Sequence, residues 1–168
     1  MTPNLVPVGP VESWPIVTCQ GVSWYVAPTY VAPVSRSELD GLCAEWGCEI
    51  PSCALVDAIW QAADLKLNPH ALMRDWRFPK DMASENAYVS QARAIQREIE
   101  RVLGLAGRES FTLLAGSHKD FARMPGDRVD LYGWTTLSGV PIEKGRSSHD
   151  GAYVDYSQGL RLVRLRWA

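Results

Sequence analysis

The chain has 168 residues, 46% of them hydrophobic, and a formal net charge of −2, which is the size and composition of one globular domain. The small negative charge argues against nucleic acid as a partner, because attraction to phosphates needs a basic face. No run reaches the roughly 18–20 apolar residues of a membrane span. The first 15 residues lack the basic and apolar regions of a secretory signal. We therefore expect a protein that is made in the cytoplasm, with neither nucleic acid nor membrane as a partner.

The N-terminal part, residues 1–34, is rich in Pro and Val and is expected to pack on the rest of a single domain, residues 1–168. It contains one predicted strand, residues 16–26. A first helix follows, because Ser35 and Glu38 have the spacing of a capping box. Gly47 is expected to end this helix.

Two more helices are predicted before the chain changes pattern. Ser52 is the expected N-cap of the second, and Asn68–Pro69 is expected to end it. Ser84 caps a third helix of about five turns, and Gly104 fits the left-handed position after its end. The third helix has a predicted inner face made of Tyr88, Ala92, Ile95, Ile99 and Val102.

From residue 110 onward, the alternation is that of strands. The four predicted strands are residues 111–118, 128–134, 151–156 and 160–167. The alternation in the last one shifts by one residue, which indicates a bulge or a strand that leaves one sheet face for another. The sequence thus predicts an α+β fold, with N-terminal helices packed on a C-terminal antiparallel sheet.

Cys53 has the sequence context of a possible nucleophile. It lies in the predicted first turn of the second helix, where unpaired N–H groups and the helix dipole favour a thiolate. His118 and His149 follow among the predicted strands. A cysteine on a helix, followed by a histidine on a strand, is the chain order of papain-like cysteine hydrolases. The competing interpretation is that Cys53 is a small residue packed in the core.

Three segments resemble, in order, the NlpC/P60 group of papain-like cysteine peptidases, which cleave peptide bonds in bacterial cell walls. Trp46–Gly47 and residues 52–56 look like that group's tryptophan–glycine segment and its helix beginning Asp-Cys-Ser-Gly-Leu-Val. Residues 125–129 are similar to its Pro-Gly-Asp-Leu-Val turn, and residues 148–153 to its strand His-Val-Gly-Ile-Tyr.

The resemblance implies a papain-like core in which Cys53 is the nucleophile and His149 the general base. Asp155, Ser157 or Gln158 would orient the imidazole of His149. The implied substrate is peptidoglycan, and the implied reaction is hydrolysis of an amide bond.

The C-terminal part also resembles a group of uncharacterised bacterial and phage proteins that end in Tyr-Val-Asp-Tyr-Ser-His-Gly-Ile-Arg-Leu-Val. In that group, threonine takes the place of Cys53, which moves the functional residues to the C-terminal half. Short polar and aromatic residues are also dense between residues 147 and 161, which is typical of a ligand cleft. The substrate-binding candidates are His118, Asp120, Tyr132, Trp134, Tyr153, Tyr156, Ser157 and Arg161.

Two functional hypotheses follow. The first is a peptidoglycan peptidase or amidase that uses Cys53 and His149 and reaches the cell wall after lysis or injection. The alternative is a non-enzymatic phage- or cell-wall-associated protein that binds a glycan or peptide in an aromatic-rich cleft. We expect no cofactor and no metal, although His118, His149 and one of Asp150 or Asp155 could hold zinc. The nucleotide-binding, serine-hydrolase and zinc-protease motifs are missing from the sequence.

Overall fold

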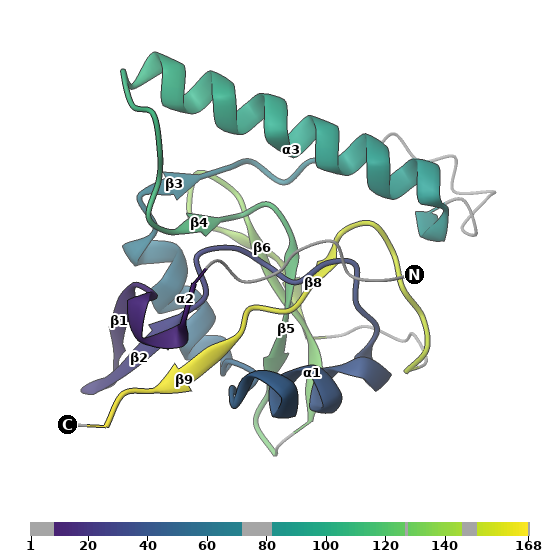
Figure 1. Ribbon diagram of the computed structural model, residues 1–168. Coiled ribbons are helices and arrows are strands. Elements are labelled where there is room, and N and C mark those ends of the chain that lie inside the picture. The colour runs from purple at the N-terminus through teal and green to yellow at the C-terminus, as the bar shows by residue number, and fades with distance from the viewer. Residues whose placement is uncertain (1–8, 72–81, 127, 146–150, 168) are drawn as a thin grey trace.

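The computed structural model describes residues 9–71, 82–126, 128–145 and 151–167 (Figure 1). Its helices are η1 (Val11–Ser13), η2 (Arg36–Glu38), α1 (Leu39–Trp46), α2 (Cys53–Ala62) and α3 (Glu85–Leu105), where η denotes a 3-10 helix. Within these ranges, no helix combines the length and the apolar character needed to cross a membrane.

The strands form three sheets. β1 (Ile16–Cys19), β2 (Val22–Val26) and β9 (Val163–Leu165) make an antiparallel sheet, and β3 (Leu65–Lys66) pairs in parallel with β4 (Leu114–Ala115). The largest sheet has the order β7-β6-β5-β8, built from Pro141–Lys144, Val129–Thr135, Lys119–Arg123 and Gln158–Gly159. The α+β class is confirmed. The largest sheet is mixed rather than antiparallel, because β8 runs parallel to β5.

The predicted strand at residues 16–26 is a hairpin of two strands. Cys19 pairs with Val22, so Gln20 and Gly21 form a two-residue turn. Both have positive φ values, of 50° and 78°. A two-residue turn with positive φ at both positions has a backbone twist that matches the right-handed twist of the flanking strands. Turns of this kind therefore commonly join the two strands of a hairpin.

Local capping was predicted correctly at three helix starts. The backbone N–H of Ser35 donates to Glu38 Oε2 over 2.7 Å, which completes the predicted capping box at η2. Ser52 accepts from the N–H of Leu55, and Ser84 accepts from the N–H of Ala87. At the other end of α1, Gly47 has the expected left-handed conformation, with φ of 58°.

Two helix ends were predicted wrongly. The second helix ends at Ala62, before Asn68, because β3 pairs with β4 from a segment far along the chain. Asp64 supports this pairing by accepting from the N–H of Leu113. The third helix runs through Gly104 to Leu105, and the residue with positive φ is Gly107.

The C-terminal strands are shorter than predicted. Residues 111–118 contain only β4, and the described residues 151–156 contain no strand. Residues 128–134 correspond closely to β6, as predicted. The predicted strand at residues 160–167 contains only β9, and the chain passes from β8 in the largest sheet to β9 in the N-terminal sheet.

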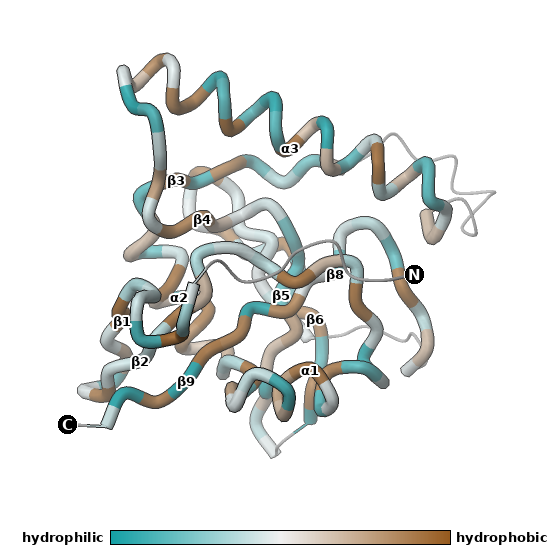
Figure 2. The backbone as a smooth tube through the Cα atoms, viewed as in Figure 1, coloured by the Kyte–Doolittle hydropathy of each residue, from teal (hydrophilic) through white to brown (hydrophobic). Residues whose placement is uncertain are grey.

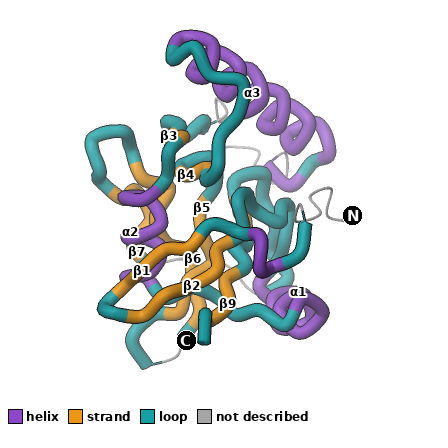
Figure 3. Tube along the Cα trace, turned by 60° about the vertical axis from the view of Figure 1, so that its left-hand side comes forward, coloured by secondary structure: helices purple, strands orange, loops and turns teal. Residues whose placement is uncertain are grey.

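Helix α3 lies along one side of the molecule, beside β3 and β4 (Figures 1 and 3). It carries hydrophobic and hydrophilic residues along its whole length (Figure 2). Ile95 in its middle and Leu103 near its C-terminal end pack with Leu65, Leu67 and Leu114. By contrast, α2 packs on β6, β5 and β1 and shares the central core.

Candidate functional site

Cys53 occupies the predicted position at the start of α2, but its surroundings do not stabilise a thiolate. Its Sγ lies 3.2 Å from Met124 Sδ and 3.7 Å from the carbonyl oxygen of Arg123. Burial raises the pKa of the Cys53 thiol, the Asp57 carboxylate raises it further, and a backbone hydrogen bond opposes them. The helix start therefore does not lower this pKa, in contrast to the sequence-based expectation.

The predicted general base cannot be placed. His149, like Asp150 of the zinc hypothesis, lies outside the described residues. The side chains found around Cys53 are those of Met124, Asp57 and Tyr132. Tyr132 donates its hydroxyl to both carboxylate oxygens of Asp57, over 3.1 and 3.0 Å. The Cys53–His149 pair therefore stays a prediction.

Asp155 and Ser157 are buried and hold the backbone of the C-terminal segment. Asp155 Oδ1 accepts from the N–H of Ser157 over 2.8 Å and from its hydroxyl over 2.6 Å. Ser157 in turn accepts from the N–H of Lys119, next to the pairing of β8 with β5. The Lys119 ammonium lies 3.2 Å from Glu143 and 3.9 Å from Asp155. These contacts give Asp155 a structural role in joining the segment to the sheet.

Arg161 is fully buried and stacks on an aromatic ring. Its guanidinium donates to the carbonyl oxygens of Ala27, over 2.7 Å, and Leu114, over 2.5 Å. The guanidinium carbon lies 3.9 Å from the ring centroid of Tyr30. Tyr30 donates its hydroxyl to Asp120 Oδ2 over 3.2 Å. One buried network thus connects the segment after β2, strand β5 and the C-terminal segment.

Asp120 in this network and His118 beside it have strongly shifted pKa values. Burial raises the pKa of Asp120 to about 7, although Arg161 and the Tyr30 hydroxyl oppose the shift. Burial lowers the pKa of His118 to about 4, and the positive charge of Arg161 adds to the decrease, while Asp155 opposes it. His118 is consequently a neutral imidazole at pH 7.

The remaining candidates lie in different places. The Trp134 ring is buried with the Lys119 ammonium 5.1 Å from its centroid. Tyr132 lies beside Asp57, and Tyr153 lines a cavity of about 390 Å³ with Tyr88 and Glu38. Of the predicted substrate-binding residues, His118 and Tyr156 line a second cavity, which is larger than the one at Tyr153.

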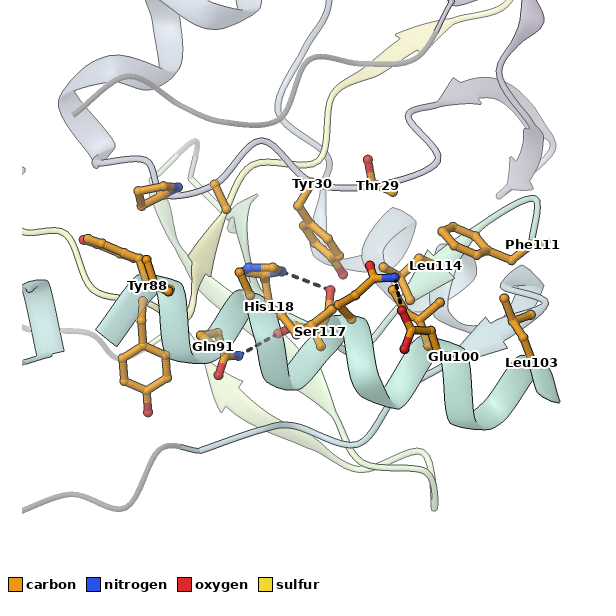
Figure 4. Close-up of a pocket in the computed structure, with 18 of the residues that line it drawn as sticks. Thr29, Tyr30, Tyr88, Gln91, Glu100, Leu103, Phe111, Leu114, Ser117 and His118 are labelled. Atoms are coloured by element: carbon orange, nitrogen blue, oxygen red, sulfur yellow. Dashed lines mark hydrogen bonds between the residues drawn. The ribbon is translucent and has the colours of Figure 1, made fainter. Parts of the chain in front are cut away.

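That cavity is a groove of about 740 Å³ between α3 and the body of the domain, and we call it the α3 groove (Figure 4). Tyr88 lies at one end of the residues labelled in Figure 4, and Leu103 and Phe111 lie at the other. One wall is α3; the rest comes from residues 29–33 and 109–118 and from Tyr156. The apolar and aromatic lining residues include Pro33, Val89, Ile95, Ile99, Leu103, Phe111 and Leu114.

The middle of the α3 groove is polar. Ser117 Oγ and His118 Nδ1 are 3.0 Å apart, and Gln91 donates its amide to the carbonyl oxygen of Ser117 over 3.4 Å. Gln91 is only 1% exposed, and its Oε1 has no hydrogen-bond partner. The neighbouring Gly116 has φ of 86°, and a Cβ there would lie 2.2 Å from the carbonyl oxygen of Leu67. Only glycine allows the close approach that positions Ser117 and His118.

The sequence analysis did not identify Tyr30, Gln91 or Ser117 as site residues. The helical spacing of Gln91 offered one indication, because it lies between Tyr88 and Ile95 on the predicted inner face. A polar amide on an otherwise apolar helix face needs a hydrogen-bond partner. The partner, the carbonyl of Ser117, became visible only in the tertiary structure.

The described residues contain no cluster of three or more His, Cys, Asp and Glu side chains that could hold a metal ion. Comparisons with protein-family models, curated proteins and solved structures gave no match.

Proposed function

We propose that this protein is a binding domain that holds an extended, peptide-like ligand in the α3 groove. The observation that carries the proposal is Gln91, which lines a 740 Å³ groove and whose buried Oε1 has no hydrogen-bond partner among the described residues. A buried acceptor without a partner costs about 1–3 kcal/mol, so a ligand that donates a hydrogen bond there would recover part of that energy.

The shape of the groove supports an elongated ligand. The lining residues of α3 extend from Tyr88 to Leu103, which corresponds to about 22 Å along the helix axis at 1.5 Å per residue. An extended peptide of about seven residues covers the same distance. The groove volume also lies in the range of about 300–1,000 Å³ that is usual for ligand sites.

The chemistry of the lining supports a peptide in particular. A peptide presents backbone N–H donors at regular intervals and can place apolar side chains between them. The groove offers Gln91 Oε1 as an acceptor, the Ser117–His118 pair beside it, and apolar surface at Ile95, Ile99 and elsewhere. The peptide stem of peptidoglycan is the ligand source that we propose, for a protein acting at a cell wall after lysis or injection.

A test of this function uses ¹⁵N-labelled protein titrated with three probes. These are a soluble muropeptide, a capped neutral heptapeptide of Leu and Ser, and chitotetraose. Chemical-shift changes at the backbone amides of Gln91, Phe111 and Ser117 are expected with the first two probes. Ala92→Trp would fill the groove and abolish these shifts, because Ala92 belongs to its lining. Ser90→Trp places the same side chain on α3 outside the lining and serves as the control.

Unchanged binding in Ala92→Trp, or no shifts with either peptide probe, would contradict the proposal. Chemical-shift changes with chitotetraose alone would indicate that the ligand is a glycan and not a peptide.

Amide hydrolysis by Cys53 is our second candidate function. It is supported by the partial exposure of Cys53 at the start of a helix that packs on β5 and β6, an arrangement compatible with a papain-like core. The raised pKa of its thiol counts against it. Release of new peptide ends from peptidoglycan sacculi, lost in both Cys53→Ala and His149→Ala, would establish this activity.

A further inference from the structure

We infer that the ligand of the α3 groove carries a positive charge at the end that lies beside Phe111. This inference rests on the proposed peptide-binding function and specifies which peptides bind. It comes from the distribution of charge along the groove, which is uneven.

The charged side chains in the described lining are both acidic. They are Glu100 on α3 and Glu109 in the segment after it, and Phe111, two residues after Glu109, belongs to the same lining. Glu100 Oε1 accepts a hydrogen bond from the side-chain amide of Gln96 over 2.8 Å. Because this amide is neutral, the bond leaves the negative charge of the carboxylate uncompensated. Carboxylates next to an aromatic ring attract ammonium and guanidinium groups through both charge and the ring quadrupole.

The cations near this end do not neutralise the two carboxylates by any ion pair found among the described residues. Arg101 forms its ion pair with Glu98, and Arg108 pairs with Asp64. Arg97 precedes Glu100 by one helical turn and is outside the groove lining. The Phe111 end therefore has negative charge available for a ligand.

The middle of the groove adds no positive charge that would repel a basic ligand. Its imidazole, His118, is neutral at pH 7, since burial lowers the pKa of His118 to about 4. Arg161 lies behind Tyr30 with 0% exposure, and its guanidinium donates to two backbone carbonyls. Gln91 belongs to the same lining, and a donor from the ligand would satisfy its buried Oε1, which has no partner among the described residues. The ligand that fits this groove therefore has hydrogen-bond donors in its middle and a positive charge at one end. A peptide with Lys or Arg near one terminus meets both requirements.

Three capped heptapeptides that differ only in one terminal residue, Lys, Gln or Glu, provide the test. Isothermal titration at low ionic strength is expected to rank them Lys, then Gln, then Glu. One favourable ion pair of up to about 1 kcal/mol corresponds to an approximately fivefold difference in Kd. We therefore expect the Lys peptide to bind up to about fivefold more tightly than the Gln peptide.

Charge variants then locate the preference. Glu100→Gln combined with Glu109→Gln is expected to remove the advantage of the Lys peptide over the Gln peptide. Glu45→Gln combined with Glu49→Gln makes the same change in net charge outside the groove and is expected to keep the preference. Equal binding of all three peptides by the wild type would overturn this inference and leave the peptide-binding function intact. Absence of binding by all three would contradict the function itself.

Discussion

The guanidinium of Arg161 stacks on the ring of Tyr30 at 3.9 Å and joins three segments that are far apart in the sequence. It donates to Ala27 O and Leu114 O, and Tyr30 extends the network to Asp120. A residue that the sequence suggested as a ligand contact thus satisfies backbone carbonyls inside the fold. Buried carbonyl groups need such donors, and a planar guanidinium can serve two at once.

Arg161→Lys is expected to lower the free energy of unfolding by about 1.5–3 kcal/mol, the contribution of one hydrogen bond to a charged group. A single ammonium does not reproduce the fork of the guanidinium or its stacking on Tyr30. Urea unfolding followed by tryptophan fluorescence measures the change. Arg164→Lys, at a partly exposed ion pair with Glu12, is the control and should change stability by less than about 0.5 kcal/mol. Equal effects of the two substitutions would contradict the role of Arg161.

Asp120 and His118 are expected to have opposite effects on the pH dependence of stability. The folded-state pKa of Asp120 is raised from 3.8 to about 7, so its contribution to stability is lost as the pH rises between these values. The pKa of His118 is lowered from 6.5 to about 4, so its contribution increases with pH between about 4 and 6.5. In the wild type, the two contributions offset each other over this window.

Asp120→Asn removes one of the two opposing contributions. Its unfolding free energy is expected to rise more steeply with pH than that of the wild type between pH 4.5 and 6.5, by up to about 1.4 kcal/mol per pH unit. Urea unfolding at three pH values tests this expectation. His118→Gln should show the opposite change of slope. Parallel pH profiles for the wild type and Asp120→Asn would show that Asp120 titrates normally.

Gly47 and Gly41 offer a matched pair of substitutions in α1. Gly47→Ala is expected to destabilise the protein by about 1–2 kcal/mol, because φ of 58° is unfavourable for a residue with a Cβ. A Cβ would meet no atom within 4 Å at either glycine, so packing does not contribute to the difference. Gly41→Ala, inside the helix, should instead stabilise by about 0.5–1 kcal/mol. Thermal unfolding of both variants measures the two effects, and a shared sign would contradict the assigned helix end.

Cys53 should react slowly with iodoacetamide at pH 7, because burial and Asp57 raise the pKa of its thiol. Asp57→Asn removes one of these causes and should accelerate alkylation at Cys53, measured by peptide-resolved mass spectrometry. Glu85→Gln, at the start of α3, is the charge-matched control and should leave the rate unchanged. Rapid alkylation of wild-type Cys53 at neutral pH would strengthen the hydrolase hypothesis at the expense of the binding hypothesis.

Local chemistry allowed several elements to be predicted from the sequence. The caps at Ser35, Ser52 and Ser84 and the left-handed Gly47 depend on residues within a few positions of each other. Strand β6 was also visible, because its alternation is regular. In contrast, β3 was mistaken for part of a helix, because Leu67 follows Ala63 at helical spacing. Its strand conformation depends on pairing with β4, which lies almost 50 residues away.

The sequence by itself determined the helix starts, the α+β class and the unusual density of polar and aromatic residues near the C-terminus. It did so because capping and periodicity are short-range properties. Only the tertiary structure decided what those residues contact: Asp155 and Arg161 are buried in the fold, and Gln91 of α3 faces Ser117, 26 positions away. The α3 groove lies between α3, which runs along one side of the domain, and segments that come from other parts of the chain. That placement is set by long-range contacts, which no local pattern encodes.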